Sequence, residues 1–208
     1  MILGTSLKHG GYYFYKIHKP KLERLNPHEN LKKFLLEMLE NCPDENFEKG
    51  PRSSILKFDL KPNLKQTKHP VNYLARIGLE SDYYGNAHLN VQMFMLAYDK
   101  NTVAIEVPLW LKPEELQNYQ EFFNSNLPLS GHIDALSIDE GKIWIWDYKP
   151  NAHREKYATT QTFFYALMLS KRTGIPLKNF MCGYFDDKNT YVFDPLSINA
   201  STLQKLNL

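Results

Sequence analysis

The sequence predicts an α/β (α+β) domain in which helices flank a central mixed β-sheet. Residues 26–41 carry apolar side chains at three- and four-residue steps, which is the period of an amphipathic helix. From residue 86 onward the pattern predicts a helix, three strands, a second helix and a strand pair. The 208 residues are enough for one domain with a sizeable core.

The first 70 residues are expected to form an N-terminal helical and basic extension that packs on the core. Its helix, 26–41, begins after Asn26-Pro27, and Cys42-Pro43-Asp44 ends it. Residues 43–70 are rich in Pro, Lys and Asn around one expected strand, 55–60, and mark the predicted boundary. Residues 71–208 are then the core.

Within the core, residues 71–79 favour a helix. Residues 86–97 form a short apolar run that fits a helix or a strand, and a helix is favoured. Residues 102–111 predict a strand, and residues 113–123, with Pro and two Glu in the first turn, predict a short helix.

The second half of the core begins with two strands, 133–138 and 143–148, joined by a tight turn that contains a glycine. A helix over about 155–172 follows and is closed by Gly174 and Pro176. Residues 180–185 and 191–193 predict the final strand pair.

Composition and cysteine count bound the class of protein. Hydrophobic residues make up 43% and aromatic residues 13%, which is typical of a globular chain. The longest apolar stretch near the start has four residues, so neither a signal peptide nor a membrane span is expected. Cys42 and Cys182 form no CxxC pair, which predicts neither a zinc site nor a disulfide framework and favours a reducing, cytoplasmic setting.

Charge is distributed unevenly along the chain. Residues 1–80 carry a net charge of +5 and residues 81–208 a net charge of −3. A basic first part beside an acidic second part suits a protein that holds a polyanion near a cation-binding carboxylate cluster. A solvated, lysine-rich surface explains the same numbers.

Three charged residues are expected to converge on the predicted strand pair. Asp134 lies at the start of one antiparallel strand and Asp147 near the end of its neighbour, so their side chains can meet. Lys149, two residues further, projects from the same face as Asp147. Two neighbouring carboxylates repel each other unless a cation lies between them, and Mg²⁺ prefers such oxygen ligands. An ammonium group beside them could orient a water or stabilise phosphate charge, which is the chemistry that phosphodiester hydrolysis requires.

These residues also fit ordinary surface positions without a function. Asp and Lys two residues apart at a strand end are common on surfaces, and one D-x-K pair is weak evidence. However, Asp147 directly follows the apolar run 143–146, which indicates a strand buried on both faces. A functional pair is therefore favoured.

With these motifs in view, the sequence resembles the PD-(D/E)XK nuclease superfamily. The resemblance rests on GHIDAL at 131–136, WDYKP at 146–150, and Gln161 followed by Tyr165, with weaker similarity over about 85–195. It looks closest to the RecB-type group, which includes the nucleases of CRISPR spacer acquisition. The resemblance implies a restriction-endonuclease-like core over 71–208 and a metal-dependent deoxyribonuclease, with exonuclease or single-strand and end-processing action favoured.

The resemblance also implies roles for residues. Asp134, Asp147 and the backbone carbonyl of Tyr148 would bind Mg²⁺ or Mn²⁺, and Lys149 would serve the catalytic water. Gln161 and Tyr165, four residues apart and so on one helix face, would steady the site or contact DNA. Tyr165 also fits a core aromatic residue.

RecB-type nucleases carry a histidine metal ligand on the helix before the first core strand. His88 matches that position, although it follows Gly85 by three residues rather than the usual four. If 86–97 were a strand, Glu80 would be the better first-motif residue. Glu106 is an acid inside an apolar strand, and alternation places it on the face opposite Ile105 and Val107. It is expected to be either a solvent-facing residue or a carboxylate that positions a water and assists catalysis.

Partners follow from the same features. Arg154 and Lys156, directly after the second catalytic strand, are expected to contact phosphates of DNA, as single strands or duplex ends. Basic and aromatic residues interleave over 8–24; they could track a strand, but a β-hairpin edge with solubilising lysines is favoured. Two cysteines cannot hold the four-cysteine iron–sulfur cluster of some RecB-type relatives, so no cluster is expected. Without a Walker A motif, unwinding would need a helicase or recombination partner.

Two rival functions remain. One is a catalytically idle nucleic-acid-binding module of the same fold, which would require lost or misplaced carboxylates. The other is a glycosidase with paired carboxylates, against which Lys149 in the cluster weighs. The sequence leaves open endo- or exonuclease action, the choice of DNA or RNA, and the oligomeric state.

Overall fold

The structure is a computed structural model that describes residues 1–23, 25, 28–81 and 84–198. One eight-stranded sheet runs through it in the order β1-β2-β4-β5-β6-β7-β8-β3, and β6–β7 is the parallel pair in an otherwise antiparallel sheet. The strands are β1 Ile2–Lys8, β2 Tyr12–His18, β3 Lys65–Thr67, β4 Thr102–Leu111, β5 Leu129–Asp139, β6 Lys142–Tyr148, β7 Phe180–Phe185 and β8 Thr190–Phe193. The predicted mixed sheet is therefore confirmed.

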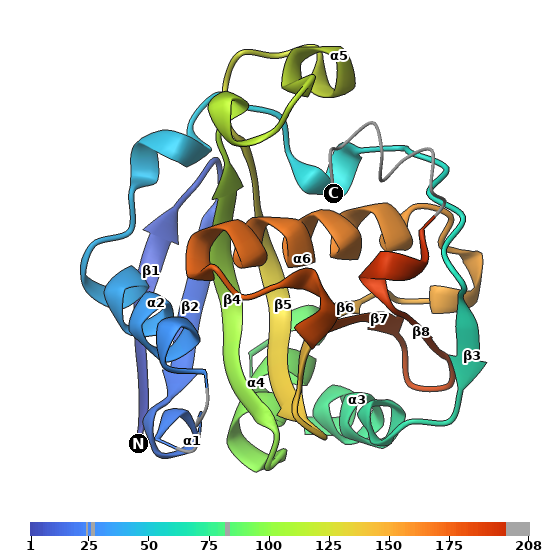
Figure 1. Ribbon diagram of the computed structural model, residues 1–208. Coiled ribbons are helices and arrows are strands. Elements are labelled where there is room, and N and C mark those ends of the chain that lie inside the picture. Colours follow the sequence, from blue (N-terminus) through green and yellow to red (C-terminus); the bar gives the residue numbers. More distant parts are fainter. Residues whose placement is uncertain (24, 26–27, 82–83, 199–208) are drawn as a thin grey trace.

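Helices cover both faces of the sheet. The α-helices are α1 Lys19–Leu22, α2 Glu29–Glu40, α3 Pro70–Ser81, α4 Ala87–Tyr98, α5 Tyr119–Phe123 and α6 Ala158–Thr173. Short 3-10 helices are η1 Asp44–Phe47, η2 Ser53–Ile55, η3 Pro113–Glu115, η4 Ala152–Arg154, η5 Leu177–Asn179 and η6 Pro195–Ser197. Helix α6 crosses the front of the sheet in Figure 1, and α4 lies behind β4 and β5.

Two apolar layers hold the helices to the sheet. The larger layer lies on the α6 side and includes Phe163, Leu167, Ile133 and Ile145, all almost fully buried. The smaller layer lies between the sheet and helices α3 and α4. It is made of Val71, Ala75, Val91, Met95, Leu96, Ile105, Ala135, Trp146, Tyr148 and Phe185. Apolar burial on both faces explains the long hydrophobic runs of the central strands.

The first 70 residues belong to the same sheet as the rest. Strands β1 and β2 form a hairpin from Ile2–His18 to Lys8–Tyr12, and β2 pairs with β4. For the basic and aromatic N-terminal segment, a β-hairpin edge was favoured over a nucleic-acid-binding surface, and the structure has a hairpin there. Strand β3 adds the opposite edge by pairing with β8. The division of the chain at residue 70 stays a prediction.

Two predicted elements were wrong. Residues 55–60 form no strand; they run over the α6 layer, where the Thr160 hydroxyl donates a hydrogen bond to the Phe58 carbonyl and Leu60 is buried. Side-chain burial there mimics the alternation of a strand. The predicted helix 113–123 is two pieces, η3 and α5, because Leu116 is extended and Asn118 takes a left-handed conformation with φ of 59° between them. No helix in the described part of the chain is both long and apolar enough to cross a bilayer.

Candidate active site

Two aspartates lie where strands β5 and β6 separate. The strands pair from Asp139–Lys142 to Ala135–Trp146, and β6 then continues beside β7 alone. Extending the register by one residue places Asp134 opposite Asp147. Here the backbone N–H of Tyr148 donates a 2.7 Å hydrogen bond to Oδ2 of Asp134. The register and this hydrogen bond bring the Asp134 side chain to the end of β6, next to Asp147 in the chain.

Asp147 is fully buried with a charged partner beside it. Lys149 Nζ lies 2.9 Å from Oδ2 of Asp147 as an ion pair. Among the described residues, neither oxygen of Asp147 has a hydrogen-bond partner of normal geometry. Burial, and then the negative charge of Asp134, raise the pKa of Asp147 to about 7. Burial lowers the pKa of Lys149, but the charges of Asp147 and Asp134 outweigh it and leave that pKa raised.

Helix α4 brings His88 to the point where β5 and β6 separate, which we call the fork. Asn86 caps the helix by accepting hydrogen bonds from the backbone N–H groups of His88 and Leu89, at 2.9 and 3.2 Å. The cap fixes the first turn, and His88 Nε2 lies 3.0 Å from Oδ2 of Asp134. Because 87–98 is a helix, the condition that would have favoured Glu80 is not met; Glu80 is exposed on α3.

The charges of His88 and Asp134 shift each other's pKa. The negative charge of Asp134 is the largest cause that raises the pKa of His88, to about 9. Burial raises the pKa of Asp134, but the positive charge of His88 and the hydrogen bond between them outweigh it and hold that pKa below its usual value. Asp134 and His88 therefore favour each other's charged forms.

Glu106 joins this pair from strand β4. It adopts a positive φ of 51°, so Ile105 packs in the α4 layer whereas Val107 packs in the α6 layer. The predicted alternation, which put both on one face, was wrong because this backbone conformation interrupts the pleat. Gln92 of α4 donates a 2.6 Å hydrogen bond to Oε1 of Glu106. Burial raises the pKa of Glu106 to about 7.

These donor atoms fit a divalent cation. One ligand atom each from His88, Glu106 and Asp134 lie within 4.8 Å of one another. Buried Asp147, whose oxygens have no hydrogen bond of normal geometry besides the ion pair with Lys149, interacts electrostatically with Asp134. A buried carboxylate without a hydrogen bond is costly, and a hard cation would satisfy it. Burial, and then the charge of Asp134, raise the pKa values of Glu106 and Asp147, so a positive charge placed among these carboxyl groups would favour their ionised forms.

Helix α6 supports the site from the other face. Gln161 Nε2 donates a 2.9 Å hydrogen bond to the Tyr165 hydroxyl, and both side chains are buried. A Cβ at Gly131 would collide with Ser53 Oγ and the Tyr165 ring, so the strand can approach α6 only with glycine at this position. Burial, followed by the charges of Asp147 and Asp134, raises the pKa of Tyr165. Tyr165 is therefore both a core aromatic residue and a neighbour of the two aspartates.

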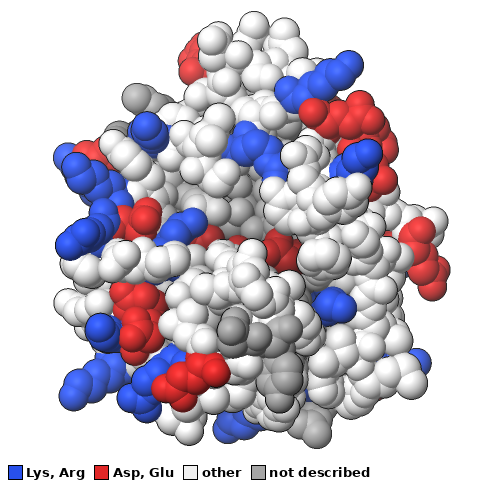
Figure 2. All heavy atoms as spheres, turned by 180° about the vertical axis from the view of Figure 1, so that it is seen from behind, with Lys and Arg blue, Asp and Glu red and all other residues white. Residues whose placement is uncertain are grey.

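The two residues expected to contact phosphates, Arg154 and Lys156, lie at the surface. Arg154 in η4 and Lys156 are exposed. Lys156 lines a cavity of about 490 Å³ together with Lys61, Tyr157 and Tyr184. On the side of the molecule opposite α6, the surface is hollowed near its centre, with Asp and Glu atoms in the hollow and basic side chains beside it (Figure 2).

Gln92 is the residue that sequence reasoning missed. It lies one helical turn after His88 and is almost fully buried, and its amide holds the Glu106 carboxylate. A polar residue four positions from a suspected ligand, inside an apolar helix, was the available signal. Its role depends on β4, whose position against α4 the sequence does not reveal.

Comparison with known proteins agrees with this geometry. A family model described as the PD-(D/E)XK nuclease superfamily matches residues 14–205. No curated protein matches the chain significantly. The superfamily consists of nucleases that hydrolyse phosphodiester bonds with divalent metal ions, on a restriction-endonuclease-like fold with which the observed mixed sheet and flanking helices agree. Since the match covers most of the sequence and includes both aspartates and Lys149, this chain belongs to the PD-(D/E)XK nuclease superfamily.

Proposed function

We propose that the chain hydrolyses phosphodiester bonds of DNA with Mg²⁺ or Mn²⁺, as a RecB-type nuclease that acts on single strands or duplex ends. His88, Asp134, Asp147 and the backbone carbonyl of Tyr148 would hold the cation, with Glu106 beside them. When bound, the cation polarises the scissile phosphate and lowers the pKa of water. The RecB assignment is supported by the position of His88 on the helix that precedes β4.

The proposal rests mainly on the complete burial of the Asp147 carboxyl group. A fully buried carboxylate that has an ion pair with Lys149 but no hydrogen bond of normal geometry is expensive to keep in a fold. The Lys149 ammonium group contacts one of the two carboxylate oxygens of Asp147, Oδ2. A protein that used this fork merely as structure would be more stable with an apolar or amide side chain there. A metal-binding role explains why the carboxylate is retained.

The side chains divide the chemical work. Lys149 Nζ lies 2.9 Å from Asp147, where its positive charge can orient the attacking water and stabilise the negative charge that grows on phosphate oxygens. Gln92 fixes the orientation of Glu106 through its 2.6 Å hydrogen bond. Gln161 and Tyr165 steady the α6 side of the fork.

Arg154 and Lys156 are proposed to bind the DNA backbone. Both follow Lys149 closely in the chain and are exposed, and Lys156 shares its cavity with a second lysine, Lys61. Cationic side chains of this kind position a polyanion without reading its sequence. A helicase or recombination partner would deliver the unwound strand.

The catalytically idle module is the second candidate. It would bind the same nucleic acids through the same basic residues without cutting them. The arrangement of Asp134, Asp147 and Lys149 weighs against it, because an idle site is under no constraint to keep two neighbouring buried carboxyl groups beside one ammonium group.

A substrate panel tests the proposal. The purified chain is incubated with end-labelled single-stranded DNA, duplex DNA, closed circular DNA and RNA, with Mg²⁺, Mn²⁺ or EDTA. Cleavage of DNA that EDTA abolishes and that Asp147→Asn removes is the expected result. Glu37→Gln, an equally conservative change at an exposed position of α2, is the matched control and should cleave like wild type. Binding without cleavage in every metal would support the idle module.

A further inference from the structure

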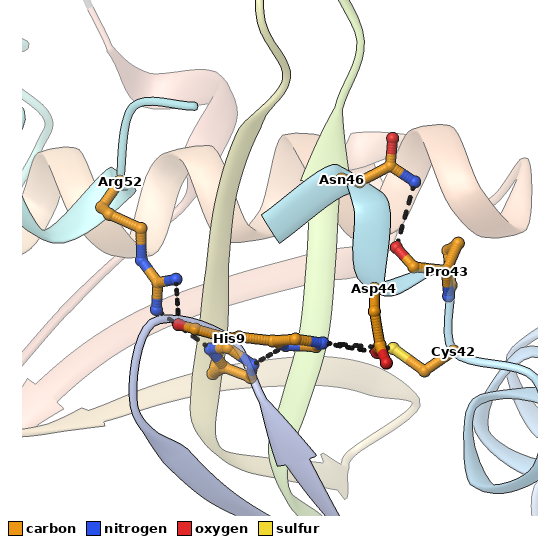
Figure 3. A network of polar contacts seen from close by, with 7 residues as sticks. His9, Cys42, Pro43, Asp44, Asn46 and Arg52 are labelled. Atoms are coloured by element: carbon orange, nitrogen blue, oxygen red, sulfur yellow. Dashed lines mark hydrogen bonds and ion pairs between the residues drawn. The ribbon is translucent and has the colours of Figure 1, made fainter. Parts of the chain in front are cut away.

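A second cluster of potential metal ligands lies outside the candidate active site. It joins His9, just after β1, to Cys42, just after α2, and to Asp44, the first residue of η1 (Figure 3). His9 Nε2 lies 2.8 Å from Oδ1 of Asp44 and 4.0 Å from Sγ of Cys42. One ligand atom from each of the three residues lies within 4.8 Å of the other two.

The imidazole of His9 is held in place by its surroundings. Its ring stacks on Phe47 with centroids 3.8 Å apart and planes within 7° of parallel, and it is almost fully buried. Its Nδ1 lies 2.9 Å from Nε2 of His132 on β5, and Arg52 donates a hydrogen bond to its carbonyl oxygen. One ring nitrogen is thus engaged inside the protein while Nε2 faces Cys42 and Asp44.

We propose that His9, Cys42 and Asp44 form a binding site for a thiophilic divalent cation, with Zn²⁺ as the fitting ion. Imidazole, thiolate and carboxylate are the three side-chain ligands that zinc takes in tetrahedral sites. In such a site neighbouring ligand atoms stand roughly 3.5 Å apart, and the distances here bracket that value.

The surroundings supply what such a site needs besides ligands. A metal-bound histidine usually anchors its other ring nitrogen through a hydrogen bond. His132 offers that partner to His9 Nδ1. The side chain of Asp44 is 63% exposed, which leaves an entry path and room for a water as fourth ligand. The cation would replace the present His9–Asp44 hydrogen bond.

Occupancy of the site would tie together three segments that are distant in sequence. The turn between β1 and β2 would be joined to the connection between α2 and η1, and through His132 to β5. Cysteine spacing could not indicate this, because only one of the two cysteines takes part. The proposal does not depend on the nuclease function, since none of its ligands belongs to the candidate active site.

Cobalt(II) absorption tests the site in the full chain. Bound Co²⁺ should show a thiolate-to-metal band and the visible bands of tetrahedral geometry at one equivalent, in wild type and in Asp147→Asn. Cys42→Ser should lose the thiolate band, whereas Cys182→Ala should keep it. Cys182 is the chain's other cysteine and is buried in β7, so it is the matched control. Absence of the band in folded wild type, or its survival in Cys42→Ser, would overturn the proposal.

A variant of the exposed ligand Asp44 tests the site without the risk of disturbing the fold. Asp44→Ala changes a side chain at the surface and should fold normally, yet bind Zn²⁺ at least about tenfold more weakly in competition with Co²⁺. In Asp147→Asn, Zn²⁺ should raise the melting temperature, and Asp44→Ala in that background should reduce the rise. Unchanged zinc affinity and an unchanged shift in Asp44→Ala would contradict the assignment, whatever happens to cleavage.

Discussion

His88 Nε2 lies 3.0 Å from Oδ2 of Asp134, and this contact joins the first turn of α4 to β5 at the point where β5 leaves β6. The contact favours the protonated form of His88. The negative charge of Asp134 is the main cause that raises the pKa of His88 to about 9.

The metal-free protein should lose stability as pH rises. His88 has a higher pKa in the folded chain than in the unfolded chain, so its contribution is complete below about pH 6.5 and is lost as pH rises through about 9. In EDTA, His88→Gln should therefore be less stable than wild type by roughly 1 kcal/mol at pH 6, a modest value because the ring is partly exposed. The difference should vanish near pH 10. Urea unfolding at several pH values measures it.

A double-mutant cycle provides the control. In an Asp134→Asn background the largest of the charges that raise the pKa of His88 is gone and those of Glu106 and Asp147 remain, so the effect of His88→Gln on stability should depend much less on pH. The same pH trend in both backgrounds would show that the contact with Asp134 is not its source.

Metal affinity should fall steeply with acid. Glu106 and Asp147 have pKa values of about 7, raised first by burial, and protons on these groups compete with the cation. Between pH 8 and pH 6 the Kd for Mn²⁺ should rise more than about tenfold, with proton release on binding. Calorimetry in two buffers of different ionisation enthalpy measures both. Affinity independent of pH would mean that these carboxyl groups do not contact the cation.

Much of the central sheet could be predicted from the sequence. The strands β4 and β6 are long apolar runs that end at turn residues, so their ends and the Asp147–Lys149 pair were predictable. Helix α4 was less certain, because a short apolar run carries no clear period; the Asn86 cap decides it in the structure.

Other features depend on tertiary structure and could not be predicted. The positive φ of Glu106 has no local signature, since it is not a glycine, and it changes which side chains of β4 face α4. Strand β3 is three exposed polar residues that become a strand only by pairing with β8. The cluster of His9, Cys42 and Asp44 exists because the β1–β2 turn packs beside the end of α2.

Loss of Lys149 should impair cleavage far more than binding. Lys149→Ala removes the ammonium beside Asp147, and the rate of DNA cleavage should fall by about 10²–10⁴-fold. The Kd for DNA, measured in Ca²⁺, should change only a few-fold. Lys33→Ala, on the exposed face of α2, is the control and should leave both quantities unchanged. Equal cleavage by the two variants would remove Lys149 from the mechanism.

Gly131 should tolerate no side chain. A Cβ there would overlap Ser53 and the ring of Tyr165, so Gly131→Ala should destabilise the fold by roughly 1–3 kcal/mol and disturb the adjacent fork. Thermal and urea unfolding measure the change. Gly11→Ala is the control, because its nearest neighbour leaves ordinary van der Waals space. Similar stability of both variants would show that α6 and β5 are not in close contact at this position.

Occupancy of the fork by a cation is the most direct test of the central claim. Crystals soaked in Mn²⁺, and measured at a wavelength where manganese scatters anomalously, should show a peak in contact with the carboxylates of Asp134 and Asp147. The peak should be absent in Asp147→Asn crystals treated in the same way. A well-ordered fork without a manganese peak at saturating Mn²⁺, or a peak that persists unchanged in Asp147→Asn, would contradict the proposed metal site.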